Sequence, residues 1–150
     1  MSESDYAAEL DAVLAVVDRE TRAFWDKDFD AWSHCWAHEA YTRTMGYWPL
    51  GGVSVVEGWD AQSALIRRMM EDIPAPNPTA GLVRRDNINA RIFRDVAWLT
   101  FDQYGLDTGD PTFDMPGLSR ETRILERHGD QWKLVYVGWM LVGEEVKNLG

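Results

Sequence analysis

The C-terminal half of the sequence is a succession of segments with the pattern of β-strands, and this feature restricts the fold most. Residues 83–93 alternate apolar and polar side chains, as expected for a strand with one buried side. Residues 96–106 follow, then a loop at 107–117 that is rich in Gly, Pro and Asp. Residues 118–127 and 131–141 come next, and a His-Gly-Asp sequence at 128–130 forms a turn between them. The pattern predicts an antiparallel meander.

Helical patterns precede these strands. Apolar residues in 5–26 recur at the three- and four-residue spacing of an amphipathic helix. Asp28 is placed to cap a second, short helix. Residues 39–56 are expected to form two short extended segments around a turn, and 59–73 a third helix. Helices grouped before an antiparallel sheet indicate an α+β fold, with the helices covering one sheet face.

Size and charge narrow the functional classes. The chain has 150 residues, the length of one domain, and no linker to a second domain is visible. Its formal net charge is −10, from 25 acidic and 15 basic residues. Such a surface repels phosphates, so nucleic acid is not expected as a partner.

The sequence also predicts a cytoplasmic protein. Cys35 is the one cysteine, so no internal disulfide can form, which fits a reducing compartment. The N-terminus is acidic where a secretion signal would be basic. No uninterrupted apolar run approaches the ~18 residues that a membrane helix requires, so no association with a membrane is expected.

A family resemblance enters with the last predicted hairpin. Residues 119–135 read Ser-Arg-Glu-Thr-Arg-Ile-Leu-Glu-Arg-His-Gly-Asp-Gln-Trp-Lys-Leu-Val. This segment resembles the final hairpin of SnoaL-like domains of the nuclear transport factor 2-like superfamily, including the association domain of calcium/calmodulin-dependent protein kinase. Residues 56–60 and 102–104 are similar to two further parts of that family.

The resemblance implies a cone, in which a strongly curved antiparallel sheet wraps over about three N-terminal helices and encloses a pocket. Homodimers are common among such proteins, and we expect one here. Many such domains carry His-x-His-x-Ser on the last strand, where residues 136–140 of this chain are Tyr-Val-Gly-Trp-Met. We therefore do not expect this chain to carry out any chemistry that depends on those histidines.

Strand alternation, combined with the resemblance, selects the side chains expected to face the pocket. Trp98, Thr100, Asp102 and Tyr104 share one side of their strand. On the next two strands the corresponding sets include Glu121 with Arg123, and Trp132 with Tyr136. The predicted ligand-binding residues are Trp36, Trp98, Thr100, Glu121 and Tyr136.

Arg123 is the first candidate for a polar anchor. In the family that the chain resembles, the arginine of Glu-Thr-Arg points into the cavity, and a guanidinium can bind a carboxylate with two hydrogen bonds. The ligand would then be a small apolar or carboxylate-bearing molecule. The alternative is an ion pair with Asp102 or Glu121 that only neutralises a buried charge.

Asp102 is the candidate general base, because desolvation in an apolar pocket makes a carboxylate more basic. Tyr104 and Tyr136 could donate hydrogen bonds to a developing oxyanion, although tyrosines in such positions more often form an amphipathic wall. The predicted catalytic residues are Asp102, Tyr104 and Arg123. A structural ion pair between Asp102 and Arg123 is the alternative for both charges.

No metal or other cofactor is expected. His34 and His38 are four residues apart, but a zinc site needs at least a third ligand and no zinc-binding pattern is present. The sequence predicts a small-molecule pocket protein of the SnoaL-like type, which could be a cofactor-independent lyase, isomerase or cyclase that acts on an apolar oxygenated substrate. The alternative is a non-catalytic module for ligand binding, dimerisation or assembly.

Overall fold

A computed structural model describes residues 1–49, 51–77, 83–105, 117–143 and 149. Most of the loop expected at 107–117 lies outside these residues. The elements in chain order are α1 (Glu3–Asp26), α2 (Phe29–His34), β1 (Arg43–Trp48), β2 (Gly52–Glu57), α3 (Trp59–Asp72), β3 (Arg84–Phe93), β4 (Val96–Gly105), β5 (Gly117–His128) and β6 (Gln131–Gly143). The predicted α+β class and element order are confirmed.

Local capping explains where the first two helices begin. The Ser2 side chain accepts from the backbone N–H of Asp5, and the Asp5 side chain accepts from the backbone N–H of Ser2, which is a capping box. Helix α1 ends at Lys27 in the left-handed conformation, with φ 61°. Asp28 then caps α2 by accepting from the N–H of Ala31 at 3.1 Å, as its position in the sequence predicts.

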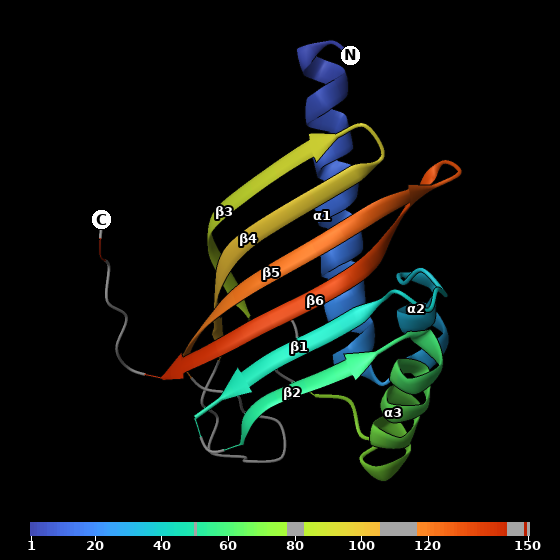
Figure 1. Cartoon of the computed structure of the whole chain (residues 1–150), viewed down its shortest axis with the longest axis vertical. Helices are drawn as coiled ribbons and strands as arrows, with labels where there is room; N and C mark the ends of the chain where they lie inside the picture. The colour runs from blue at the N-terminus through green and yellow to red at the C-terminus, as the bar shows by residue number, and fades with distance from the viewer. Residues whose placement is uncertain (50, 78–82, 106–116, 144–148, 150) are drawn as a thin grey trace.

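The six strands form one mixed sheet in the order β2-β1-β6-β5-β4-β3 (Figure 1). All neighbouring strands are antiparallel except β1 and β6, which are parallel. The expectation of a wholly antiparallel sheet is wrong for this pair. No hairpin turn joins β1 to β6, so no local signal fixes their relative direction.

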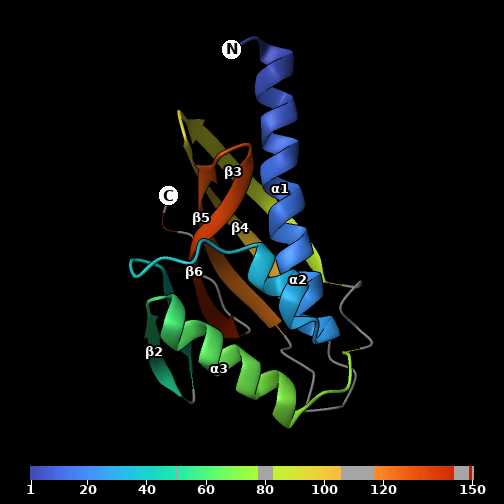
Figure 2. The ribbon, with the colours of Figure 1, turned by 90° about the vertical axis from the view of Figure 1, so that its right-hand side faces the viewer.

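The sheet is strongly curved, and the helices lie on its concave side (Figures 1 and 2). Bulges interrupt the pairing of β3 with β4 and of β5 with β6, and bulges bend the strands that contain them. Helix α1 contacts β3 and β6. The most deeply buried apolar side chains lie between α1, α2 and the sheet: Val13, Val17, Trp32, Leu99, Leu125 and Leu134.

One bulge in β6 decides which side chains face the helices. Leu134 pairs with Leu125, but Tyr136 pairs with Ile124, so Val135 is an extra residue in β6. An extra residue reverses the alternation of all side chains beyond it. Trp132 and Leu134 therefore point to the core, and after the bulge the odd-numbered residues do so.

No helix among the described residues is long and apolar enough to cross a membrane.

Candidate functional site

A cavity of about 330 Å³ lies between the C-terminal half of α1, helix α3 and the concave face of the sheet. This volume is at the lower end of the range for small-molecule sites. Most of its wall is apolar and includes Phe24, Trp25, Leu65, Ile66, Met69 and Val137. Polar side chains reach it from several elements, so the cavity combines an apolar wall with a few polar groups.

Arg123 and Glu121 form a buried ion pair at the cavity wall. Arg123 Nη2 donates to Glu121 Oε1 at 2.8 Å, and the two side chains are 6% and 5% exposed. Arg123 Nη1 donates to the backbone carbonyls of Thr122 and Gly138 at 3.0 and 3.3 Å. The sequence left open whether Arg123 anchors a ligand or forms an ion pair with Asp102 or Glu121. The structure contains the ion pair with Glu121.

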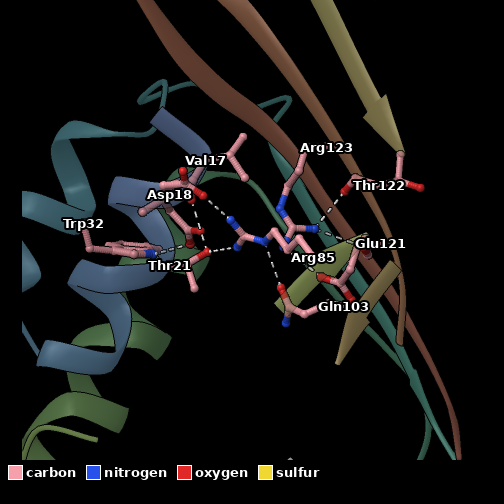
Figure 3. A network of polar contacts seen from close by, with 11 residues as sticks. Val17, Asp18, Thr21, Trp32, Arg85, Gln103, Glu121, Thr122 and Arg123 are labelled. Carbon is pink, nitrogen blue, oxygen red and sulfur yellow. Dashed lines mark hydrogen bonds and ion pairs between the residues drawn. The ribbon is translucent and has the colours of Figure 1, made fainter. Parts of the chain in front are cut away.

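A second arginine, which is partly buried, lies near Arg123. Arg85 on β3 binds Asp18 through Nη1, Thr21 through Nη2 at 2.6 Å, and Gln103 through Nε at 3.2 Å (Figure 3). Burial, and then the neighbouring positive charge of Arg123, lower the pKa of Arg85. Each of the two guanidinium groups thus has a carboxylate of its own.

Glu20 brings a third carboxyl group to the cavity. It lies on α1, is 8% exposed, and its Oε1 accepts from Trp32 Nε1 at 3.0 Å. Burial raises the pKa of the Glu20 carboxyl, against the opposing effects of Arg123 and of the Trp32 hydrogen bond. Glu20 makes no ion pair with any described residue.

Side chains around the cavity also hold polar atoms that lack a partner. Within the described part of the chain, five buried side-chain nitrogen or oxygen atoms make no standard hydrogen bond: Trp36 Nε1, Thr44 Oγ1, Gln62 Oε1, Arg123 Nε and Trp139 Nε1. All five belong to residues that line the cavity. Unpartnered buried polar groups are rare because each costs free energy. Their concentration around one cavity therefore makes this cavity the candidate binding site.

Three of the predicted site residues lie at the cavity. Arg123 and Glu121 are on the inward side of β5, and Trp36 follows α2. On the neighbouring strand β4, Leu99 pairs with Arg123 and Phe101 pairs with Glu121, so Leu99 and Phe101 point to the same side of the sheet as the cavity. Directly paired residues lie on the same face of a sheet.

The predicted orientation of β4 is therefore wrong. Asp102 pairs with Arg120 across the sheet, and Arg120 Nη1 donates to Asp102 Oδ1 at 2.6 Å on the outer face. Trp98 is 40% exposed and Thr100 is exposed, while Tyr104 contacts the guanidinium of Arg84 at 4.2 Å. Alternation grouped these residues correctly but could not decide which group faces the helices.

Tyr136 was also assigned to the wrong face, for a different reason. Its expected orientation extended the alternation of Trp132 and Leu134 without interruption, but the extra residue Val135 reverses that alternation. Tyr136 consequently lies on the outer face, paired with Arg43 and Ile124. Val137, Trp139 and Leu141 line the cavity instead.

The sequence prediction missed Glu20, Thr44, Gln62 and Trp139. A signal for Glu20 was available, because it falls seven residues after Val13 and three after Val17 on the apolar stripe of α1. A carboxylate within such a stripe is unusual unless it is paired or serves a function. No comparable signal marked Thr44 or Trp139, whose positions depend on the pairing of β1 with β6.

The three histidines line a separate hollow of about 250 Å³ together with Lys133. His38 stacks on Trp59 with ring centroids 4.1 Å apart, and His128 Nε2 lies 3.3 Å from Glu126 Oε1. Among the described residues, no group of three or more His, Cys, Asp or Glu side chains is arranged to hold a metal ion. Cys35 is buried, and its burial raises the pKa of the thiol to about 11.

The sequence and the fold are both similar to those of known proteins. Residues 13–138 match the family model of the SnoaL-like domain. The fold is similar to a proposed calcium/calmodulin-dependent protein kinase type II association domain from Thiobacillus denitrificans. The identity is 20%, over 85% of this chain and 93% of that one, with a TM-score of 0.63.

Two further structures show the same fold. A proposed dehydratase of the nuclear transport factor 2-like family from Streptomyces avermitilis is 17% identical, over 91% of this chain and 97% of that one, with a TM-score of 0.66. A nuclear transport factor 2-like protein of unknown function from Pseudomonas putida is 16% identical, over 93% and 88%, with a TM-score of 0.66. No protein of curated function matches the sequence significantly.

Proposed function

The chain belongs to the SnoaL-like domain family, and from the cavity that its fold builds we propose that it binds a small, mostly apolar molecule that carries an acceptor oxygen. The observation that carries this proposal is the set of unpartnered polar atoms on cavity-lining side chains. Trp36, Arg123 and Trp139 each offer an N–H, and Thr44 offers a hydroxyl. A ligand oxygen would satisfy such donors, and the apolar walls would bury its carbon skeleton.

Catalysis by a lyase, isomerase or cyclase mechanism has less support than binding. The base expected for it was Asp102, whose carboxylate is held by Arg120 at 2.6 Å and does not line the cavity. The proposed dehydratase from Streptomyces avermitilis is similar at only 17% identity, which speaks for the fold. Ligand binding is therefore the function that the geometry supports best.

The binding proposal predicts an effect of Trp139→Phe, which keeps an aromatic ring and removes the N–H. 1-Indanone, a neutral aromatic ketone, is a suitable probe, titrated against the protein while the indole N–H resonances are followed by NMR. We expect saturable binding, and a dissociation constant raised about two- to tenfold in Trp139→Phe, the cost of about one hydrogen bond. Trp98→Phe, on the outer face, is the matched control and should bind as the unmodified protein does. Equal effects of the two substitutions would contradict the proposal.

We also propose that the outer face of the sheet forms a homodimer. Five apolar side chains are exposed there on adjacent strands: Met45, Tyr47, Val53, Val55 and Met140. Met45 pairs with Val55, and Tyr47 pairs with both Val53 and Met140, so the five form one continuous patch. A second copy of the chain would cover this patch, and the similarity to a proposed association domain supports such a role.

Introduction of a charge into the patch should separate the two copies. Val55 is 47% exposed, and we expect Val55→Glu to convert a dimer into a monomer in size-exclusion chromatography with light scattering. Ile73→Glu, at the end of α3 and 41% exposed, is the control and should remain dimeric. A monomeric unmodified protein at all concentrations would sink this part of the proposal.

A further inference from the structure

One buried acceptor atom of the cavity has no use for a ligand that carries only an acceptor oxygen. Gln62 Oε1, on α3, is the carbonyl oxygen of a side-chain amide, so it can only accept a hydrogen bond. No group among the described residues donates to it. Gln62 lines the cavity and is 3% exposed, so bulk water has little access to the side chain. A buried acceptor without a donor costs free energy in the protein without ligand.

The helix itself turns Gln62 toward the cavity. Helix α3 contacts β2 at one edge of the sheet (Figures 1 and 2). Three apolar residues of α3 follow Gln62 at the three-, four- and seven-residue spacing of one helix face, and all three line the cavity: Leu65, Ile66 and Met69. Gln62 is thus the polar member of the inward stripe, where a glutamine is seldom buried.

A second glutamine at the same cavity has the contacts of a structural residue. Gln103 Oε1, on β4, accepts from Arg85 Nε at 3.2 Å, and the same guanidinium is bonded to Asp18 and Thr21 on α1 (Figure 3). Gln103 therefore helps to hold the sheet against α1. The Oε1 of Gln62 makes no such link within the described part of the chain, so it is available to a ligand.

The unpartnered donors and this acceptor reach the cavity from different elements. Thr44, Arg123 and Trp139 extend from three strands of the sheet, whereas Gln62 extends from α3. A ligand carbonyl oxygen satisfies the donors only, and Gln62 Oε1 then stays buried without a donor. A hydroxyl group elsewhere on the ligand supplies that donor and brings no charge into the cavity.

We propose that Gln62 determines the specificity of the cavity by accepting a hydrogen bond from a ligand hydroxyl, so that the site selects hydroxylated carbonyl compounds over the same skeleton without the hydroxyl. This inference rests on the proposed binding function, which it deepens by naming the ligand class. It assigns a donor to the one acceptor among the unpartnered atoms of the described residues, beside the donors that bind the carbonyl oxygen.

Indanones with and without a hydroxyl group test this preference. The probes are 1-indanone, its 4-, 5- and 6-hydroxy derivatives and their methyl ethers, titrated by calorimetry at about pH 6, where the phenol groups keep their protons. We expect at least one hydroxy derivative to bind about tenfold more tightly than 1-indanone, through one further hydrogen bond to a buried acceptor. Its methyl ether keeps the oxygen but lacks the donor, and should show no such gain.

Gln62→Met removes the acceptor and keeps a side chain of similar length and volume. The quantity to compare is the ratio of two affinities, for the hydroxy derivative and for 1-indanone, because a general change in the cavity affects both probes. We expect this ratio to fall from about ten to about one in Gln62→Met. Gln131→Met, at an exposed residue of the last hairpin, is the matched control and should keep the ratio of the unmodified protein.

Stability without ligand provides a second test. Gln62→Met should raise the melting temperature by about 2–4 °C, because it removes a buried acceptor that has no donor. Gln103→Met should lower the melting temperature, because it takes a partner from Arg85 Nε. Scanning calorimetry of the two ligand-free variants measures both changes, and their opposite signs separate a residue that serves a ligand from one that serves the fold.

Equal affinities for 1-indanone and its hydroxy derivatives would overturn this inference and leave small-molecule binding in place; the donor to Gln62 would then be water. An equal gain with the methyl ether, or an unchanged ratio in Gln62→Met, would overturn it as well. A Gln62→Met variant that fails to fold or is less stable would make Gln62 a structural residue and exclude the proposed role. If neither 1-indanone nor any derivative binds, the proposed function fails, and this inference fails with it.

Discussion

Replacement of Arg123 by methionine is expected to lower the free energy of unfolding by about 3–5 kcal/mol, because it leaves the Glu121 carboxylate buried without its partner. The ion pair is 2.8 Å long and both side chains are almost inaccessible to water. The substitution also removes the donor to the carbonyls of Thr122 and Gly138. Urea unfolding followed by tryptophan fluorescence measures the change.

Arg120→Met provides the matched control for this experiment. Arg120 is also an arginine of β5 with a carboxylate partner, but its side chain is 36% exposed and that of Asp102 is 12% exposed, so water reaches this pair more easily and the loss should be smaller than for Arg123→Met. The double variant Arg123→Met with Glu121→Leu removes both charges and should recover part of the lost stability. An Arg123→Met variant that loses no more stability than Arg120→Met would show that the buried pair has no special energetic role.

Gly46→Ala is expected to disturb the cavity wall and to cost about 1–3 kcal/mol of stability, the usual range for overpacking. A Cβ at Gly46 would lie 2.0 Å from Cε2 and Cζ2 of Trp139, so the indole ring would have to move. Trp139 also contacts Trp48 edge-on, with centroids 6.3 Å apart. We expect a changed near-ultraviolet circular dichroism spectrum and weaker binding of 1-indanone.

Gly51→Ala is the control for this substitution. A Cβ at Gly51 would be 3.8 Å from Trp48 Cγ, an ordinary contact, so stability and spectrum should change little. The interpretation of Gly46 as the residue that makes room for Trp139 would be lost if the two alanine variants had the same stability and the same spectrum.

Much of the fold follows from local patterns that the sequence displays directly. The three- and four-residue spacing of apolar residues predicts the helices, and Asp28 marks the start of α2 because its side chain can accept from Ala31. The His-Gly-Asp turn predicts the last hairpin, and Gly129 there has φ 67°. These signals act between residues close in sequence, so they can be interpreted without tertiary structure.

The candidate site was predicted only in part. Arg123, Glu121 and Trp36 lie at the cavity, whereas Asp102, Tyr104 and Tyr136 lie on the outer face. Alternation gives two possible faces for each strand, and the packing of Leu99 and Phe101 against the helices chose between them in β4. In β6 the choice was made by Val135, an extra residue visible only in the pairing with β5.

The sequence by itself determined the order of helices and strands and the family hairpin with its Glu-Thr-Arg arginine. It also determined which side chains of β4 and of β5 share a face. Tertiary structure alone decided which face encloses the cavity, because this depends on the register of strands far apart in the chain. It also gave Arg85 and Arg123 a carboxylate partner each, and no described residue forms an ion pair with Glu20, since the partners of a buried charge depend on every element packed around it.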